Sequence, residues 1–263
     1  MSKADAPPRN AAGRVPTAPR YWAQARDENP LARFVPFSSL LSPHDVLTRG
    51  GDYLRTWRLD GVPFECADEH LIAERHEALC SLLRNLAGGQ WAVWTHRLHR
   101  TVSDELQHPR DAGFARDLSV AYQGRLSQHR MMSNELYLTL VYRPNVSRVS
   151  RALQSTQRTR AAIAEAQAEA LRVMDERTAL VGRVLRGFGP ELLGTRERRG
   201  RTYSEVAEFL GYLINGCWRP VPMSAGPLYR TLPTARLSFG GDKLELRQGD
   251  QRRFAALVDI KEY

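Results

Sequence analysis

Alternating and helical spacing of apolar residues divides most of the chain into strands and helices. Strict alternation, or a short apolar run bounded by turn residues, predicts strands over 46–49, 53–59, 91–100, 135–143, 235–239, 243–247 and 253–260. Apolar residues at every third or fourth position predict helices over about 68–86, 114–128 and 205–214, and a longest helix within 145–189. Because these elements lack regular β-α-β alternation, we predict an α+β fold: a mainly antiparallel sheet built from hairpins, with long helices packed on one side.

Turn and capping residues support several of these boundaries. The glycine pairs at 50–51 and 240–241 supply the positive φ that a tight hairpin requires. Asp68 and Ser204 precede two of the predicted helices as N-caps. The segment 91–100 has apolar residues on both faces, which predicts an interior strand.

The first 30 residues differ from the rest of the chain. They are rich in proline and arginine and contain few residues that a core would bury. We therefore predict a mobile basic tail over 1–30 and one folded domain over 31–263. A short apolar patch at 34–41 begins the folded part, where it packs on the domain or touches a partner.

Charge narrows the choice of partners but does not decide it. The 263 residues carry 38 Lys and Arg against 29 Asp and Glu, a formal charge of +9, and nearly all of the positive residues are arginine. Such a surplus favours nucleic acid, phospholipid head groups or an acidic protein as partners, although arginine-rich composition also follows from a GC-rich genome. No signal-peptide core or membrane-spanning apolar stretch is present, so we expect a cytoplasmic protein.

The motifs that mark the common catalytic sites are missing from the sequence. It contains no Walker phosphate loop, no Gly-x-Ser-x-Gly nucleophile motif and no Cys-x-x-Cys pair. Neither His70 and His76 nor His96 and His99 have the spacing of two ligands to one metal ion. We therefore assign no catalytic, cofactor-binding or metal-binding residue in this chain.

The densest basic cluster consists of Arg196, Arg198, Arg199 and Arg201. One interpretation is a contact patch for nucleic acid, lipid head groups or an acidic protein surface. The other is a solvated loop without a partner, because short charge runs are usually solvated.

A set of segments in fixed order resembles one protein family. It includes Leu47-Thr-Arg-Gly-Gly-Asp-Tyr-Leu-Arg-Thr-Trp-Arg-Leu-Asp-Gly61, Asn134-Glu-Leu-Tyr-Leu-Thr-Leu-Val-Tyr-Arg-Pro144 and Arg253-Phe-Ala-Ala-Leu-Val-Asp-Ile-Lys-Glu-Tyr263. In order and spacing, residues 31–263 resemble the N-terminal domain of the CagE/TrbE/VirB family, the large ATPases of bacterial type IV secretion and conjugation systems.

The resemblance implies a docking role without chemistry. In this family a non-catalytic N-terminal domain docks the ATPase on inner-membrane subunits and sister protomers, and a C-terminal RecA-like domain binds ATP and Mg. With no Walker residues, this chain is expected to be inactive alone and to hold no cofactor. We expect it to lie in the cytoplasm, peripheral on the bacterial inner membrane, with its basic tail and arginine cluster near anionic lipid. The alternatives are a stand-alone basic nucleic-acid-binding module and a small enzyme of unknown class.

Overall fold

The computed structural model describes residues 31–62, 68–102, 113–126, 131–144, 159–223, 226–241 and 243–256. Four of the sequence predictions lie wholly or partly outside these residues. They are the N-terminal tail over 1–30, the end of the helix predicted over 114–128, the first part of the long helical region at 145–158, and the end of the last strand at 257–260.

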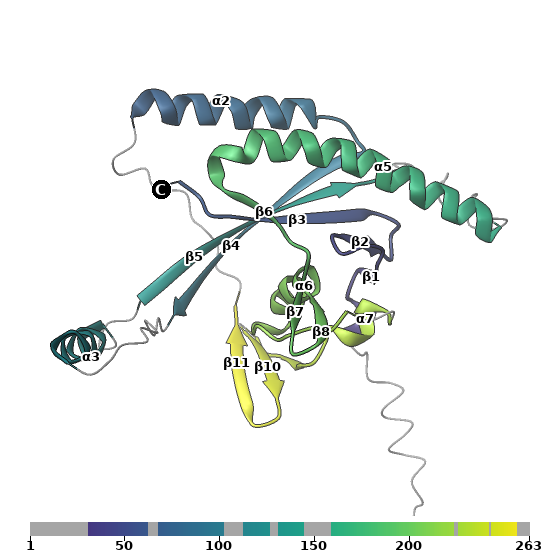
Figure 1. Cartoon of the computed structure of the whole chain (residues 1–263). Helices are drawn as coiled ribbons and strands as arrows, with labels where there is room; N and C mark the ends of the chain where they lie inside the picture. Colours follow the sequence, from purple (N-terminus) through teal and green to yellow (C-terminus); the bar gives the residue numbers. More distant parts are fainter. Residues whose placement is uncertain are drawn as a thin grey trace, which may run out of the picture.

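A central antiparallel sheet organises the chain (Figure 1). Its strands run in the order β1 (Phe37–Leu40), β2 (Asp45–Thr48), β3 (Tyr53–Leu59), β5 (Met131–Tyr142) and β4 (Trp91–Val102). A short strand, β6 (Pro190–Leu192), also pairs with β3. Together with the helices, this sheet confirms the predicted α+β class and the hairpin between β2 and β3.

Helices cover both faces of this sheet, whereas the sequence predicted helices on one side only. Figure 1 shows α2 (Glu69–Asn85) and α5 (Arg160–Val184) above the sheet, and α6 (Glu205–Asn215) and α7 (Leu228–Thr231) below it. Two apolar cores result, the upper one around Trp57, Leu140 and Met174 and the lower one around Leu54, Val141 and Phe209. The one-sided prediction was wrong because β3 and β5 present apolar side chains alternately to both faces.

The strand β4 lies at the edge of the sheet, which corrects the prediction of an interior strand. Within the described residues it pairs with β5 alone. Trp91 and Val93 pack against the upper core, while Trp94 and Leu98 pack against the lower one. Helices on both faces therefore account for the apolar pattern without a second neighbouring strand.

The C-terminal part contains two further small sheets. One has the order β11 (Gln251–Ala255), β10 (Leu244–Gln248), β9 (Arg236–Phe239), which confirms the predicted hairpin between β9 and β10. The other is a hairpin of β7 (Thr195–Arg198) and β8 (Arg201–Ser204), where the sequence predicted a loop. Between these two sheets in the sequence, a short helix, α7, follows Pro227, which is its N-cap.

The link from α5 to β6 depends on one glycine. The helix passes into a 3₁₀ turn, η2 (Leu185–Phe188), which ends at Gly189 with a φ of 60°. A Cβ at this position would lie 2.6 Å from the Oδ2 atom of Asp60, so a side chain fits neither the backbone conformation nor the space. Gly189 thus brings the chain back onto β3.

The remaining described helices are η1 (Leu31–Arg33) and α3 (Phe114–Leu126). The predicted N-caps are confirmed, since the Asp68 side chain accepts a hydrogen bond from His70 N and the Ser204 side chain accepts one from Ala207 N. Among the described helices, none is both long and apolar enough to cross a membrane.

Candidate functional site

The predicted basic cluster forms the β7–β8 hairpin. Arg198 pairs with Arg201 across the hairpin, and Arg199 and Gly200 make the two-residue turn with φ angles of 53° and 70°. Positive φ at both turn positions is the geometry that matches the right-handed twist of two antiparallel strands. The four arginines of the predicted cluster therefore belong to one hairpin, although their contacts differ.

Arg196 fixes the base of this hairpin to α6. Its Nη2 atom donates to both carboxylate oxygens of Glu208, at 2.9 and 2.7 Å. The Glu208 side chain is only 7% exposed, so this ion pair is partly shielded from water. The backbone N–H of Val221 donates to the same carboxylate. Arg196 is therefore a structural anchor for the hairpin.

Arg198, Arg199 and Arg201 are the exposed part of the cluster. Arg198 and Arg201 lie directly opposite each other, so their side chains share one face of the hairpin. Like charges in this position repel and destabilise the pairing. An anion placed against this face would remove that repulsion.

Beside the hairpin lies a polar cavity of about 290 Å³ that the sequence did not predict. It lies between the lower face of the sheet, β6, the base of the hairpin and α6, and its lining includes Arg58, Arg100, Glu135, Tyr137, Glu191, Arg196, Glu205 and Glu208. No local sequence signal could have revealed it, because charges such as Arg58 and Glu191 become neighbours only when β6 pairs with β3.

The carboxylates of this cavity are held by neighbouring donors. Glu191 pairs with Arg58 at 2.6 Å, and Glu135 accepts hydrogen bonds from Arg100 and from the hydroxyl of Tyr137. Burial, together with the charge of Glu135, raises the pKa of Tyr137, while hydrogen bonding to Glu135 raises the pKa of Arg100. Such paired groups favour a structural role over acid–base chemistry.

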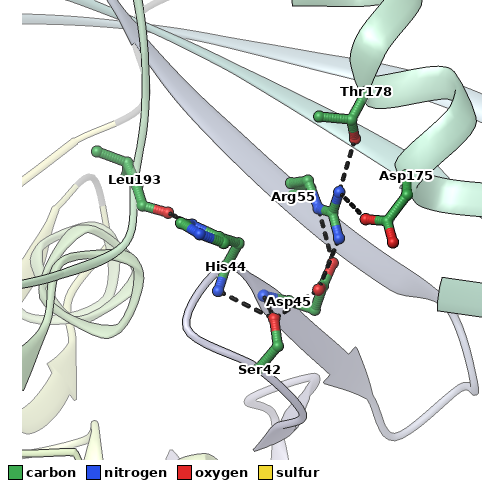
Figure 2. Close-up of polar contacts among 7 residues, drawn as sticks. All are labelled: Ser42, His44, Asp45, Arg55, Asp175, Thr178 and Leu193. Atoms are coloured by element: carbon green, nitrogen blue, oxygen red, sulfur yellow. Dashed lines mark hydrogen bonds and ion pairs between the residues drawn. The ribbon is translucent and has the colours of Figure 1, made fainter. Parts of the chain in front are cut away.

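A second polar cluster joins β2, β3 and α5 on the upper face of the sheet. Figure 2 shows Arg55 between two carboxylates: its Nε and Nη2 atoms donate to Asp45 at 2.8 and 2.7 Å, and its Nη1 atom donates to Asp175 at 2.7 Å. Nη1 also donates to the Thr178 hydroxyl at 2.9 Å. Ser42 donates to the Asp45 carboxylate at 2.6 Å.

The electrostatics of Arg55 follow from its burial and its partners. Desolvation by itself would lower the pKa of this guanidinium, but the hydrogen bonds and charges of Asp45 and Asp175 outweigh it, and the pKa is raised. The Arg55 and Asp45 side chains are 6% and 3% exposed, whereas Asp175 is 70% exposed. This cluster therefore fixes two elements of the sheet to α5.

A neighbouring contact ties the start of β2 to the segment before the basic hairpin. The Nδ1 atom of His44 lies 2.8 Å from the Leu193 carbonyl oxygen (Figure 2). Deeper in the lower core, the His96 ring meets Phe209 edge to face at 5.4 Å, and burial lowers the pKa of His96. Both histidines thus serve packing contacts.

The part of the chain that the structure describes brings together no group of three or more His, Cys, Asp or Glu side chains that could hold a metal ion. His70 and His76 lie on α2, and His96 and His99 on β4.

Comparison with known families gives the class of protein. Residues 44–149 match the N-terminal domain of the type IV secretion system ATPase VirB4/TrbE. Residues 191–263 match the CagE, TrbE, VirB family, described as a component of the type IV transporter system. The two matches follow each other along the chain and together define its class as a family of type IV transporter components. Within that class, the chain belongs to the CagE/TrbE/VirB family and carries its VirB4/TrbE N-terminal domain.

Individual relatives agree with this assignment. The chain is 36% identical over 253 residues to a type IV secretion system protein PtlC homolog of Bordetella bronchiseptica, covering 92% of this chain and 30% of the relative. It is 36% identical over 252 residues to the type IV secretion system protein virB4 of Brucella abortus, with 93% and 30% covered. Identity to the protein virB4 of Agrobacterium tumefaciens is 28% over 233 residues, with 88% and 29% covered. The chain spans about 30% of the length of these relatives.

Proposed function

We propose that this chain is a non-catalytic docking domain of a type IV secretion ATPase. It holds the ATPase part of the whole protein against inner-membrane subunits of the secretion system and against sister protomers, on the cytoplasmic side of the bacterial inner membrane. The whole protein would power substrate translocation and pilus biogenesis. ATP and Mg would bind in a part of the whole protein that this chain does not include.

The observation that carries this proposal is the β7–β8 hairpin. Its base is anchored by the pair of Arg196 and Glu208, and its tip presents Arg198, Arg199 and Arg201 to solvent. Anionic membrane surfaces attract basic side chains by about 1 kcal/mol per residue. A rigidly anchored hairpin with three exposed arginines therefore suits contact with an anionic lipid surface. Neither the family matches nor the relatives support the stand-alone nucleic-acid-binding alternative.

Flotation with vesicles tests the lipid contact directly. We expect the chain to float with phosphatidylcholine vesicles that contain phosphatidylglycerol at about 50 mM salt. It should remain in the unbound fraction with phosphatidylcholine alone, and also at high salt, because salt screens exposed charges. The double variant Arg198→Glu and Arg201→Glu should lose this binding. Flotation that does not depend on lipid charge or salt would contradict the proposed lipid contact.

The docking role is tested in the whole protein with the same two substitutions. We expect membrane attachment and secretion to fall while ATP hydrolysis stays near the level of the unmodified protein. Folding of the variant is checked by its denaturation midpoint. A variant that loses ATP hydrolysis but remains on the membrane and in the secretion complex would contradict a docking role.

A further inference from the structure

The three-stranded sheet β9–β10–β11 carries a row of arginines across its strands. Arg247 on β10 pairs with Arg236 on β9 and with Arg252 on β11. Residues paired in this way project from the same face of a sheet, and adjacent strands lie about 4.8 Å apart. The three side chains therefore start in one line that is about 10 Å long.

This row lies on the open face of the sheet. Part of the opposite face packs on the body of the domain, where Leu246 is 7% exposed and lies near Gly216 at the end of α6. Arg236, Arg247 and Arg252 are all exposed. Figure 1 shows β10 and β11 projecting away from the central sheet.

Three further side chains lie on or beside the open face. Phe254 lies on it with 63% of its surface exposed, and the Lys243 Nζ atom sits 5.6 Å from the centre of its ring. Glu245, half-buried, is the acidic residue among the described strand positions of this face, and its carboxylate lies 3.6 Å from Arg252 Nε. Positive charge thus exceeds negative charge beside an exposed aromatic ring.

The exposed arginine row forms a line of positive charge that carboxylates on one partner element can complement. We propose that this face docks an acidic helix of a partner protein, with carboxylates at positions i, i+4 and i+8. This inference deepens the docking function proposed above and depends on it. Carboxylates with that spacing lie on one face of a helix over about 12 Å, which matches the arginine row within the reach of its side chains.

The same face favours a protein over a phosphate surface. Arginine and aromatic residues together are typical of the energetic centres of protein–protein interfaces. Phe254 supplies an apolar contact that an acidic helix with one apolar flank can cover.

Binding to designed peptides tests this proposal. The first probe is an Ala-rich helical peptide with Glu at i, i+4 and i+8, and the second has the same composition with its three Glu residues spread around the helix. We expect the chain to bind the first peptide at least about tenfold more tightly at low salt, measured by fluorescence anisotropy. Equal binding of the two peptides would overturn the proposal.

Two charge-matched variants locate the binding site. Arg247→Glu with Arg252→Glu reverses one cross-strand pair of this row, and Arg198→Glu with Arg201→Glu reverses the equivalent pair of the β7–β8 hairpin. We expect the first variant to weaken peptide binding about tenfold or more and the second to leave it unchanged. Equal loss in both variants would show attraction by net charge alone and overturn the proposal. Loss of vesicle or oligonucleotide binding without loss of peptide binding would overturn it as well.

The same pair of variants separates this inference from the proposed function. If the proposed docking function is wrong, both variants of the whole protein should show normal membrane attachment and secretion. If only the acidic-helix contact is wrong, the Arg247 and Arg252 variant should secrete normally, while the hairpin variant is still impaired.

Discussion

At the scale of single residues, Arg55 shows how a polar side chain is accommodated inside the fold. The sequence places it in a strand, in a hydrophobic region next to Leu54. Only the folded chain brings Asp45 and Asp175, 10 and 120 positions away, within hydrogen-bond distance of its guanidinium. A buried charge persists when each donor finds a partner, so Arg55 depends on both carboxylates to different degrees.

Replacing Asp45 by Asn should be strongly destabilising. The change leaves a buried guanidinium without its bidentate carboxylate, and we expect the free energy of unfolding to fall by about 3 kcal/mol. Urea denaturation measures the loss. Asp175→Asn is the matched control, because this carboxylate is largely exposed and its loss should cost less than about 1 kcal/mol. Similar losses in the two variants would contradict the assigned roles.

At the scale of elements, the β7–β8 hairpin is the clearest difference between expectation and structure. A run of charged residues without apolar alternation predicts a loop. Apolar alternation cannot detect a hairpin whose strands are exposed, because neither face of such strands is buried. The Arg199-Gly200 turn was the available signal, since glycine supplies one of the two positive φ angles. Arg199 takes the other, which is unfavourable for a residue with a long side chain.

Arg199→Asn should therefore stabilise the hairpin. Asparagine adopts positive φ more readily than arginine and is common at this turn position, so we expect a gain of about 0.5 to 1 kcal/mol in the free energy of unfolding. Urea denaturation again provides the measurement. Arg199→Gln is the matched control, because it removes the same charge at the same position without supplying a residue that favours positive φ. A gain of the same size in that control would assign the effect to charge and not to the backbone.

At the scale of the whole molecule, β3 and β5 are shared by two apolar cores. Met174 is fully buried in the upper core and Phe209 is 1% exposed in the lower one. The helices of both layers rest on the same pair of strands, as Figure 1 shows. Loss of packing on one face of the sheet should therefore also weaken the packing of the helices on the other face.

Truncation of either core tests this coupling. We expect Phe209→Ala and Met174→Ala each to lower the free energy of unfolding by about 2 to 5 kcal/mol, because each leaves a cavity in a packed core. Amide hydrogen exchange should show weaker protection in both α5 and α6 for either variant. If Phe209→Ala weakened protection in α6 and left α5 unchanged, the two layers would unfold independently.

Local pattern was enough to predict the secondary structure of long elements and the α+β class. The alternation in β3 and β5, the periodicity of α2 and α6, and the caps at Asp68 and Ser204 all express interactions between residues close in sequence. The order of the segments that resemble the family also led to the correct family, because collinear similarity does not require knowledge of the contacts.

Long-range contacts decided the rest. The second helical layer, the edge position of β4 and the arginine row on β10 depend on which strands pair and in what register, and register sets which side chains share a face. The partners of Arg196 and Arg55 come from separate elements for the same reason. Spacing along the chain describes a residue's near neighbours, whereas charge complementarity and burial arise only when distant segments pack together.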